Sequence, residues 1–146
     1  MMAKGSVKRE KRHGQAVVEF ALVLPIFLLL ILGAVDFGRA YYRLHLLTNS
    51  AREGARTASL PESTESEVHD IVENFLTNAG LSSDFDLTIT VTDPDGNERT
   101  GGLSDAEEGD RVEVLVAQDL TLIGVGIVPG TDGKLELDSS CTFRHE

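Results

Sequence analysis

One acidic side chain, Glu19, stands at the start of a long apolar stretch, five residues after Gly14. From Phe20 to Val35 every residue is apolar, proline or glycine. A carboxylate costs about 2.5 to 3.5 kcal/mol at the centre of a bilayer and less near its surface. Because of this cost, we expect Glu19 to have a function. In a medium of low dielectric constant, the natural partner of a carboxylate is an ammonium group. The alternative is an acid that reaches back to the membrane surface.

The sequence shows no motif typical of an enzyme. It contains no Gly-x-x-x-x-Gly-Lys phosphate loop, no His-Glu-x-x-His and no Gly-x-Ser-x-Gly. The four histidines are scattered, at positions 13, 45, 69 and 145, so we predict no metal site and no cofactor. Cys141 is the only cysteine, which excludes a disulfide within the chain and favours a buried thiol.

An acidic segment at 93–98 invites comparison with a calcium loop. Asp93 and Asp95 are closely spaced, but Gly96 comes too early for an EF-hand, and no Glu ends the frame. We interpret the segment as a hairpin turn.

Charge divides the chain into two unlike parts. Residues 1–58 carry a net charge of +5, and the first fourteen are strongly basic. Residues 59–146 hold 20 acidic and 4 basic side chains, a net charge of −16. Basic flanks favour the cytoplasmic side of a membrane, so we predict a single-pass protein of the inner or cytoplasmic membrane, with a cytoplasmic N-terminus and an extracytoplasmic acidic domain. Its acidity argues against nucleic acid as a partner.

The apolar stretch is long enough to cross a bilayer, which needs about 20 residues. We predict a transmembrane segment over about 16–36, from Ala16 past Val35, with a bend at Pro25 because proline lacks a backbone N–H. No further proline or loop cluster occurs before Pro61, so one helix is expected over 15–58. Its outer half then stands beyond the lipid bilayer.

The outer half of this helix repeats like charges at i, i+4, as Arg39 with Arg43 and Arg52 with Arg56. Such pairs repel, and the nearest acids are Asp36 and Glu53, with neighbouring subunits as another source. We interpret Arg39, Arg52 and Arg56 as a solvated face and assign them no site. Small residues at 51–58 permit close approach of a helix, from a neighbouring subunit or from the same domain.

Residues 59–146 have the pattern of a small α+β domain with one helix and an antiparallel sheet of about three to four strands. Thr64 and Glu67 form a capping box before apolar residues at helical spacing, and Gly80 ends that helix. Alternating residues predict strands at 86–92, 111–117 and 134–143. The apolar, glycine-rich segment 120–128 is expected to be a loop folded over the sheet, with Asp132-Gly133 marking a hairpin.

The N-terminal motifs resemble those of TadE-like pseudopilins. They are Gly14 followed by Gln-Ala-Val-Val-Glu-Phe, Leu24-Pro25-Ile26-Phe27-Leu28, Asp36-Phe37-Gly38-Arg39 and Asn49-Ser50-Ala51-Arg52-Glu53-Gly54-Ala55-Arg56. The resemblance covers Gly14 to about Ala58. Phe20 stands where the major Flp pilins commonly have Tyr, which favours a minor subunit.

The resemblance implies a minor pilin of a tight-adherence (Flp-type IV) pilus. Its leader, residues 1–14, would be removed by a prepilin peptidase that cuts between Gly14 and Gln15. Glu19 then becomes the fifth residue of the mature chain, the acid that guides cleavage or pairs with the free amine of a neighbouring subunit. The implied partners are the peptidase, other pilin and pseudopilin subunits, and the inner-membrane assembly platform.

Two other interpretations stay open. A permanently anchored type II protein with an extracytoplasmic binding domain accounts for the charge and the apolar length, but not for the spacing of Glu19 from Gly14. A secretory signal peptide cut after Ala40 would leave Tyr41 first, but the apolar run exceeds the usual 7 to 15 residues of such signals.

Overall fold

In the computed structural model of the chain, residues 11–124, 130 and 132–146 are described. The elements in chain order are α1 (Lys11–Ala58), α2 (Glu65–Asn78), β1 (Asp86–Thr92), the short 3₁₀ helix η1 (Gly102–Asp105), β2 (Arg111–Thr121) and β3 (Lys134–Arg144). The strands form one antiparallel sheet in the order β1-β2-β3. The predicted α+β fold is confirmed, with three strands.

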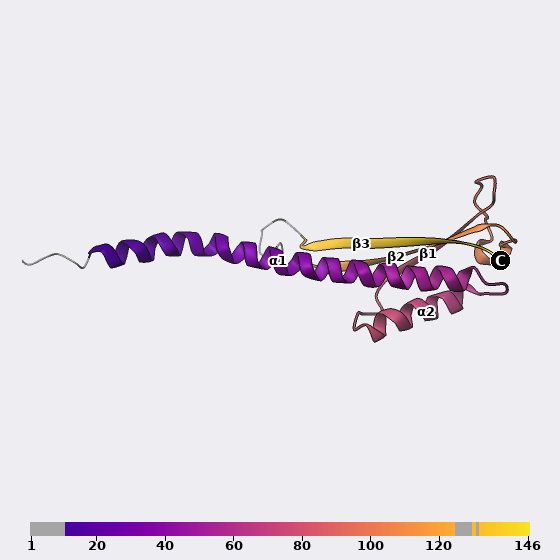
Figure 1. The fold of residues 1–146 in the computed structure, drawn as a ribbon, viewed down its shortest axis with the longest axis horizontal. Coiled ribbons are helices and arrows are strands. Elements are labelled where there is room, and N and C mark those ends of the chain that lie inside the picture. The colour runs from indigo at the N-terminus through magenta and orange to yellow at the C-terminus, as the bar shows by residue number, and fades with distance from the viewer. Residues whose placement is uncertain (1–10, 125–129, 131) are drawn as a thin grey trace, which may run out of the picture.

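Helix α1 has two halves with different surroundings (Figure 1). At about 1.5 Å per residue, its 48 residues extend about 72 Å, roughly twice the thickness of a bilayer's hydrocarbon core. Every residue from Gly14 to Ile31 is exposed, whereas the C-terminal half lies along the domain. The helix continues unbroken through Pro25, and its N-terminal half curves gently in both views. This one long apolar helix fits a single-pass membrane anchor.

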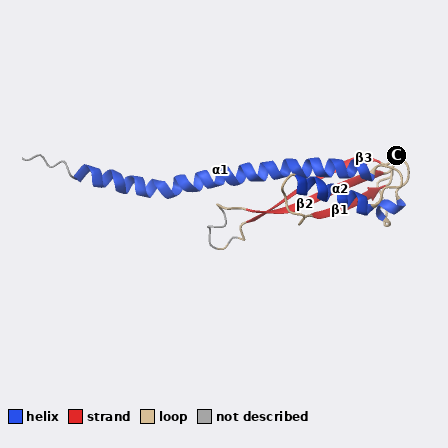
Figure 2. Cartoon of the chain, turned by 90° about the horizontal axis from the view of Figure 1, so that it is seen from below, coloured by secondary structure: helices blue, strands red, loops and turns tan. Residues whose placement is uncertain are grey.

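The core of the domain lies between the helices and one face of the sheet (Figure 2). Helix α1 supplies buried residues at helical spacing, namely Leu47, Ser50, Ala51, Gly54, Ala55 and Ala58. They meet Val68 and Val72 of α2 and Val114 of β2. The small residues therefore pack within the chain's own domain, which was one of the two predicted alternatives.

Helix α2 begins and ends as its sequence predicts. The Thr64 side chain accepts the N–H of Glu67, while the Glu67 carboxylate accepts the N–H of Thr64. At the other end Gly80 adopts φ +81°, and its N–H donates to Thr77 while that of Leu81 donates to Leu76. The left-handed conformation needed here is one that glycine adopts without steric cost.

Strand β2 is four residues longer than predicted, because it continues past Ala117 to Thr121. The polar Gln118 interrupts the alternating pattern, but its side-chain amide is buried and donates to the carbonyls of Ser82 and Asp84. Leu120 is fully buried in the strand, so the prediction of a loop from residue 120 is wrong at its start. Residues 125–128 of that predicted loop lie outside the described residues.

The connection from β1 to β2 is held by polar contacts at the end of the domain far from the exposed half of α1. After β1 the carboxylate of Asp93 accepts the N–H groups of Asp95 and Asn97, at 2.9 and 2.8 Å, as in a hairpin turn. Further on, the carboxylate of Asp110 is 1% exposed and lies 2.7 Å from Arg99 Nε. The same carboxylate accepts the N–H of Glu107 at 2.9 Å.

Substitution of Gly54 tests the packing of α1 against the domain. A Cβ at Gly54 would lie 2.9 Å from Val72 Cγ2 and 3.3 Å from Val114 Cγ1, whereas one at Gly38 meets nothing within 4 Å. We expect Gly54→Ala to lower the free energy of unfolding by about 1 kcal/mol or more through overpacking. Gly38→Ala should leave it unchanged or raise it slightly through helix propensity. Denaturant unfolding of the full chain in detergent, followed by circular dichroism, measures both, and equal effects would contradict this packing.

Acid unfolding should report on Asp110. The N–H of Glu107, and then Arg99, lower the pKa of the Asp110 carboxyl below its ordinary value of 3.8. A lowered pKa in the folded state means that the carboxylate stabilises the fold fully above about pH 4, and that this contribution is lost as pH falls through the folded value. Asp110→Asn should therefore lower the free energy of unfolding at pH 7. It should also make that free energy fall less steeply below pH 4. Glu108→Gln, at an exposed neighbour, should leave the decline unchanged in the same denaturation series.

Candidate functional site

The residues predicted to guide processing lie at the exposed beginning of α1. Gly14 is helical, and nothing comes within 4 Å of where its Cβ would be. The Nε2 of Gln15 donates to the Glu19 carboxylate at 3.1 Å, one helical turn along the same face. Phe20 is 65% exposed. The structure thus brings Gln15 and Glu19 together, and no described part of the domain covers them.

Ala16, Pro25 and Val35, predicted to lie in the transmembrane segment, are all exposed on the same uninterrupted helix. The most apolar window of this helix has none of its residues buried within the protein. Exposed side chains such as Leu22 and Leu30 would be unfavourable in water, because apolar surface is most stable away from it. This surface is suited to lipid or to the helices of neighbouring subunits.

A second polar constellation lies immediately after Val35 and joins the helix to the sheet. Asp36 is 5% exposed, and its carboxylate accepts the N–H of Ile123 at 2.9 Å and that of Gly124 at 2.6 Å. Arg39 also donates to this carboxylate, at 3.2 Å. We call these contacts the Asp36 clamp. A carboxylate that accepts several N–H groups makes strong, charge-assisted hydrogen bonds, so the clamp fixes the end of β2 against α1.

Two arginines extend the clamp along the same stretch of helix. Arg39 donates to the carbonyl of Thr121, and Arg43 donates to that of Asp119, both at 3.3 Å. These carbonyls belong to the part of β2 that continues beyond its pairing with β1, which ends at Ala117. Burial and the nearby Arg39 lower the pKa of Arg43 below its ordinary value. Arg39 keeps part of the predicted solvated face, because its side chain is 37% exposed, but it also binds β2. Asp36 is its partner, as predicted.

The other predicted ion pair within the helix is also present. Arg56 lies 3.4 Å from Glu53, and both side chains are exposed. Exposed pairs of this kind contribute little to stability. The Asp36 clamp is different because its carboxylate is buried and also holds main-chain groups far away in the sequence. Sequence reasoning missed this use of Asp36, although an acid at the end of an apolar stretch was a visible signal.

An apolar groove of about 380 Å³ lies beside the clamp, where the domain meets the membrane helix. Its lining residues are Leu29, Gly33, Asp36, Phe37, Ala40, Leu122, Gly124 and Leu135. Five of these lie on α1, two follow the end of β2, and Leu135 lies at the start of β3. The groove therefore begins within the apolar stretch of the helix and ends on the domain.

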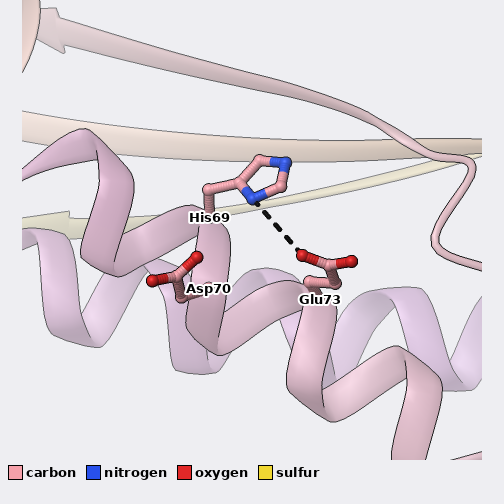
Figure 3. A group of neighbouring side chains, drawn as sticks. All are labelled: His69, Asp70 and Glu73. Carbon is pink, nitrogen blue, oxygen red and sulfur yellow. Dashed lines mark ion pairs between the residues drawn. The ribbon is translucent and has the colours of Figure 1, made fainter.

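One group of side chains on α2 has donor types suited to a metal ion (Figure 3). His69 Nδ1 lies 3.9 Å from the Glu73 carboxylate, and a carboxylate oxygen of Asp70 lies within 4.8 Å of both. His69 and Asp70 are exposed, and the His69 ring stacks on Phe85 at 5.2 Å between centroids. An i, i+4 pair on a solvated helix face explains this geometry without an ion.

The arrangement defines a class of protein: a long apolar anchor helix continuous with the core helix of a small α+β domain. Residues 14–56 match the model of a family described as "TadE-like protein". The predicted resemblance to TadE-like pseudopilins is thereby confirmed over the N-terminal helix, and the matched region begins at Gly14. No curated protein and no solved structure matches the chain.

Loss of the Asp36 carboxylate should loosen the end of β2. We expect Asp36→Asn to speed hydrogen exchange of the Ile123 and Gly124 amides by about tenfold or more, because each loses a charge-assisted hydrogen bond. Asp119→Asn is the matched control, because Asp119 is an exposed acid in the same region that pairs with Lys134 at 3.0 Å. Hydrogen exchange of the full chain in detergent micelles, read by mass spectrometry, measures both. Unchanged protection in Asp36→Asn would show that the clamp does not hold this segment.

Proposed function

We propose that this protein is a minor pilin, or pseudopilin, of a tight-adherence (Flp-type IV) pilus and that it takes part in pilus biogenesis or adhesion. The match to the TadE-like family indicates a component associated with this pilus system. The observation that carries the proposal is the bare N-terminal half of α1, with its single acid five residues after the glycine at which the family match begins.

Processing would occur between Gly14 and Gln15, with the chain acting as substrate of a prepilin peptidase. A peptidase takes its substrate as an extended strand, whereas Gly14 is helical in the free chain. Glycine in a helix lowers helix stability by roughly 0.5 to 1 kcal/mol relative to alanine, so unwinding at this position is comparatively easy. A residue without a Cβ also lets the enzyme approach the backbone closely.

Cleavage would create a cationic partner for Glu19. The new α-amino group would belong to Gln15, whose side chain already reaches Glu19 at 3.1 Å. In a bundle of such helices the carboxylate of one subunit would lie near the ammonium group of the next. In a water-poor setting each charge would stabilise the other, and loss of either would leave an unpaired charge at considerable cost.

The rest of the chain supports a structural role in an envelope machine. The exposed apolar half of α1 suits insertion in the inner membrane and later packing against other pilin and pseudopilin helices. The basic leader favours a cytoplasmic N-terminus. The assembly platform of the inner membrane would engage the protein after the leader is removed. The acidic domain, with its net charge of −16, would then lie outside the cytoplasm.

The N-terminus of the protein isolated from its native membrane tests the proposal. We expect intact mass and terminal peptide mapping to give Gln15 as the first residue. An intact leader would favour the permanently anchored type II binding protein instead, and a start at Tyr41 would indicate ordinary secretion.

Two variants separate processing from assembly. Gly14→Leu should reduce the fraction of chains that begin at Gln15 by about tenfold or more, since a clash in the peptidase costs over about 1.4 kcal/mol. Glu19→Ala should impair maturation or fibre formation and leave membrane insertion intact. Gly38→Leu and Glu53→Ala are the matched controls on the same helix. Normal N-termini and normal fibres from both test variants would contradict the proposal.

A further inference from the structure

We propose that the foot of the domain, defined as Leu122, Ile123, Gly124 and Leu135, contacts the outer leaflet of the bilayer beside the membrane helix. The chain would then have two membrane contacts, the helix and this part of the β2–β3 hairpin. The inference rests on the anchoring part of the proposed function, namely that α1 spans a membrane.

The first observation is the depth at which the foot meets α1. A Cβ added at Gly124 would lie 3.3 Å from the Cβ of Leu32 and 3.6 Å from its carbonyl carbon. Leu32 lies inside the predicted transmembrane segment, four residues before Asp36. At 1.5 Å per residue this is about 6 Å below the end of the segment. The hairpin therefore descends alongside the helix to a level where the surroundings are lipid.

The second observation is the surface that the foot and the helix form together. The groove between them is lined by Leu29 and Gly33 on α1, and by Leu122 and Leu135 on the domain. Ile123 and Leu135 are 49% and 39% exposed, and no charged residue occurs from Leu120 to Gly124. This apolar surface is continuous with the exposed face of the helix. Among the described lining residues the one acid is Asp36, and its carboxylate accepts main-chain N–H groups.

The third observation is how backbone groups at the foot are satisfied. In lipid an unpaired N–H costs several kcal/mol, because no water replaces its partner. Here Asp36 accepts the N–H groups of Ile123 and Gly124, while that of Leu122 donates to the carbonyl of Gly133 at 2.7 Å. Three successive N–H groups are thus paired at the point where the chain leaves β2. The foot has the backbone pairing and the apolar side chains that contact with acyl chains requires.

A lipid surface explains the groove better than a partner subunit's helix does. The groove reaches Leu29, within the apolar stretch, and seven of its eight lining residues are apolar or glycine. The bilayer that solvates Leu29 would therefore also reach Leu122 and Leu135. A helix from a second subunit is the competing occupant, and it would protect the groove from lipid and aqueous quenchers alike.

The test uses site-directed labelling of the full chain in vesicles of phosphatidylethanolamine and phosphatidylglycerol. A fluorophore is placed at Ile123→Cys, and separately at Leu135→Cys, in a Cys141→Ala background. Quenching is measured with lipids that carry a nitroxide on the acyl chain and with aqueous iodide. Leu30→Cys, at a 68% exposed position of the helix, is the lipid control. Thr100→Cys, exposed beyond β1, is the water control.

We expect lipid quenching at residues 123 and 135 to approach that at Leu30. Iodide quenching at both positions should be at least about threefold weaker than at Thr100. Iodide quenching at both positions equal to that at Thr100 would overturn the proposal. Protection from both quenchers would also overturn it, because protein would then cover the groove. Strong iodide quenching at Leu30 would overturn this proposal together with membrane anchoring. Retention of the leader, read from the N-terminal residue, would affect only the pilin assignment.

Discussion

The close contact of α1 with α2 and β2 at Gly54 is the constraint on which the domain depends. With no side chain at this position, the helix backbone approaches Val72 and Val114 closely enough that an added Cβ would come within 2.9 Å of a methyl group. Ala51, Ala55 and Ala58 continue this small-residue face and are fully buried. The membrane helix and the core helix are one element, so this packing also determines where the anchor leaves the domain.

The Asp36 clamp adds a second joint between the same two parts, at the other end of the sheet. Gly54 fixes the helix against the centre of the core, while Asp36, Arg39 and Arg43 fix it to the last residues of β2. The contacts at Asp36 and Gly54 are about 27 Å apart along the helix, at 1.5 Å per residue. Together they resist rotation and tilting of α1 relative to the sheet. Any force or packing applied to the membrane half of α1 would therefore reach the sheet.

This coupling gives the proposed pilin role a physical basis. Subunits that assemble through their N-terminal helices must carry their domains in a defined orientation, and a rigid joint provides it. The foot of the domain and the end of the apolar stretch of α1 line one groove. In the membrane that surface would face lipid, and in a fibre the same residues would be available to neighbouring helices.

The sequence by itself determined the elements whose signals are local. The capping box at Thr64, the turn after Gly80 and the alternating residues of β1 are visible in short segments, because caps, turns and strand alternation depend on near neighbours. The apolar stretch likewise predicts the anchor by length alone. Tertiary structure decided what depends on distant partners. Asp36 meets Ile123 and Gly124 across more than eighty residues, and Gln118 is tolerated on the inner face because the chain before β1 supplies its acceptors. No local pattern encodes such pairings, since folding alone brings the two segments together.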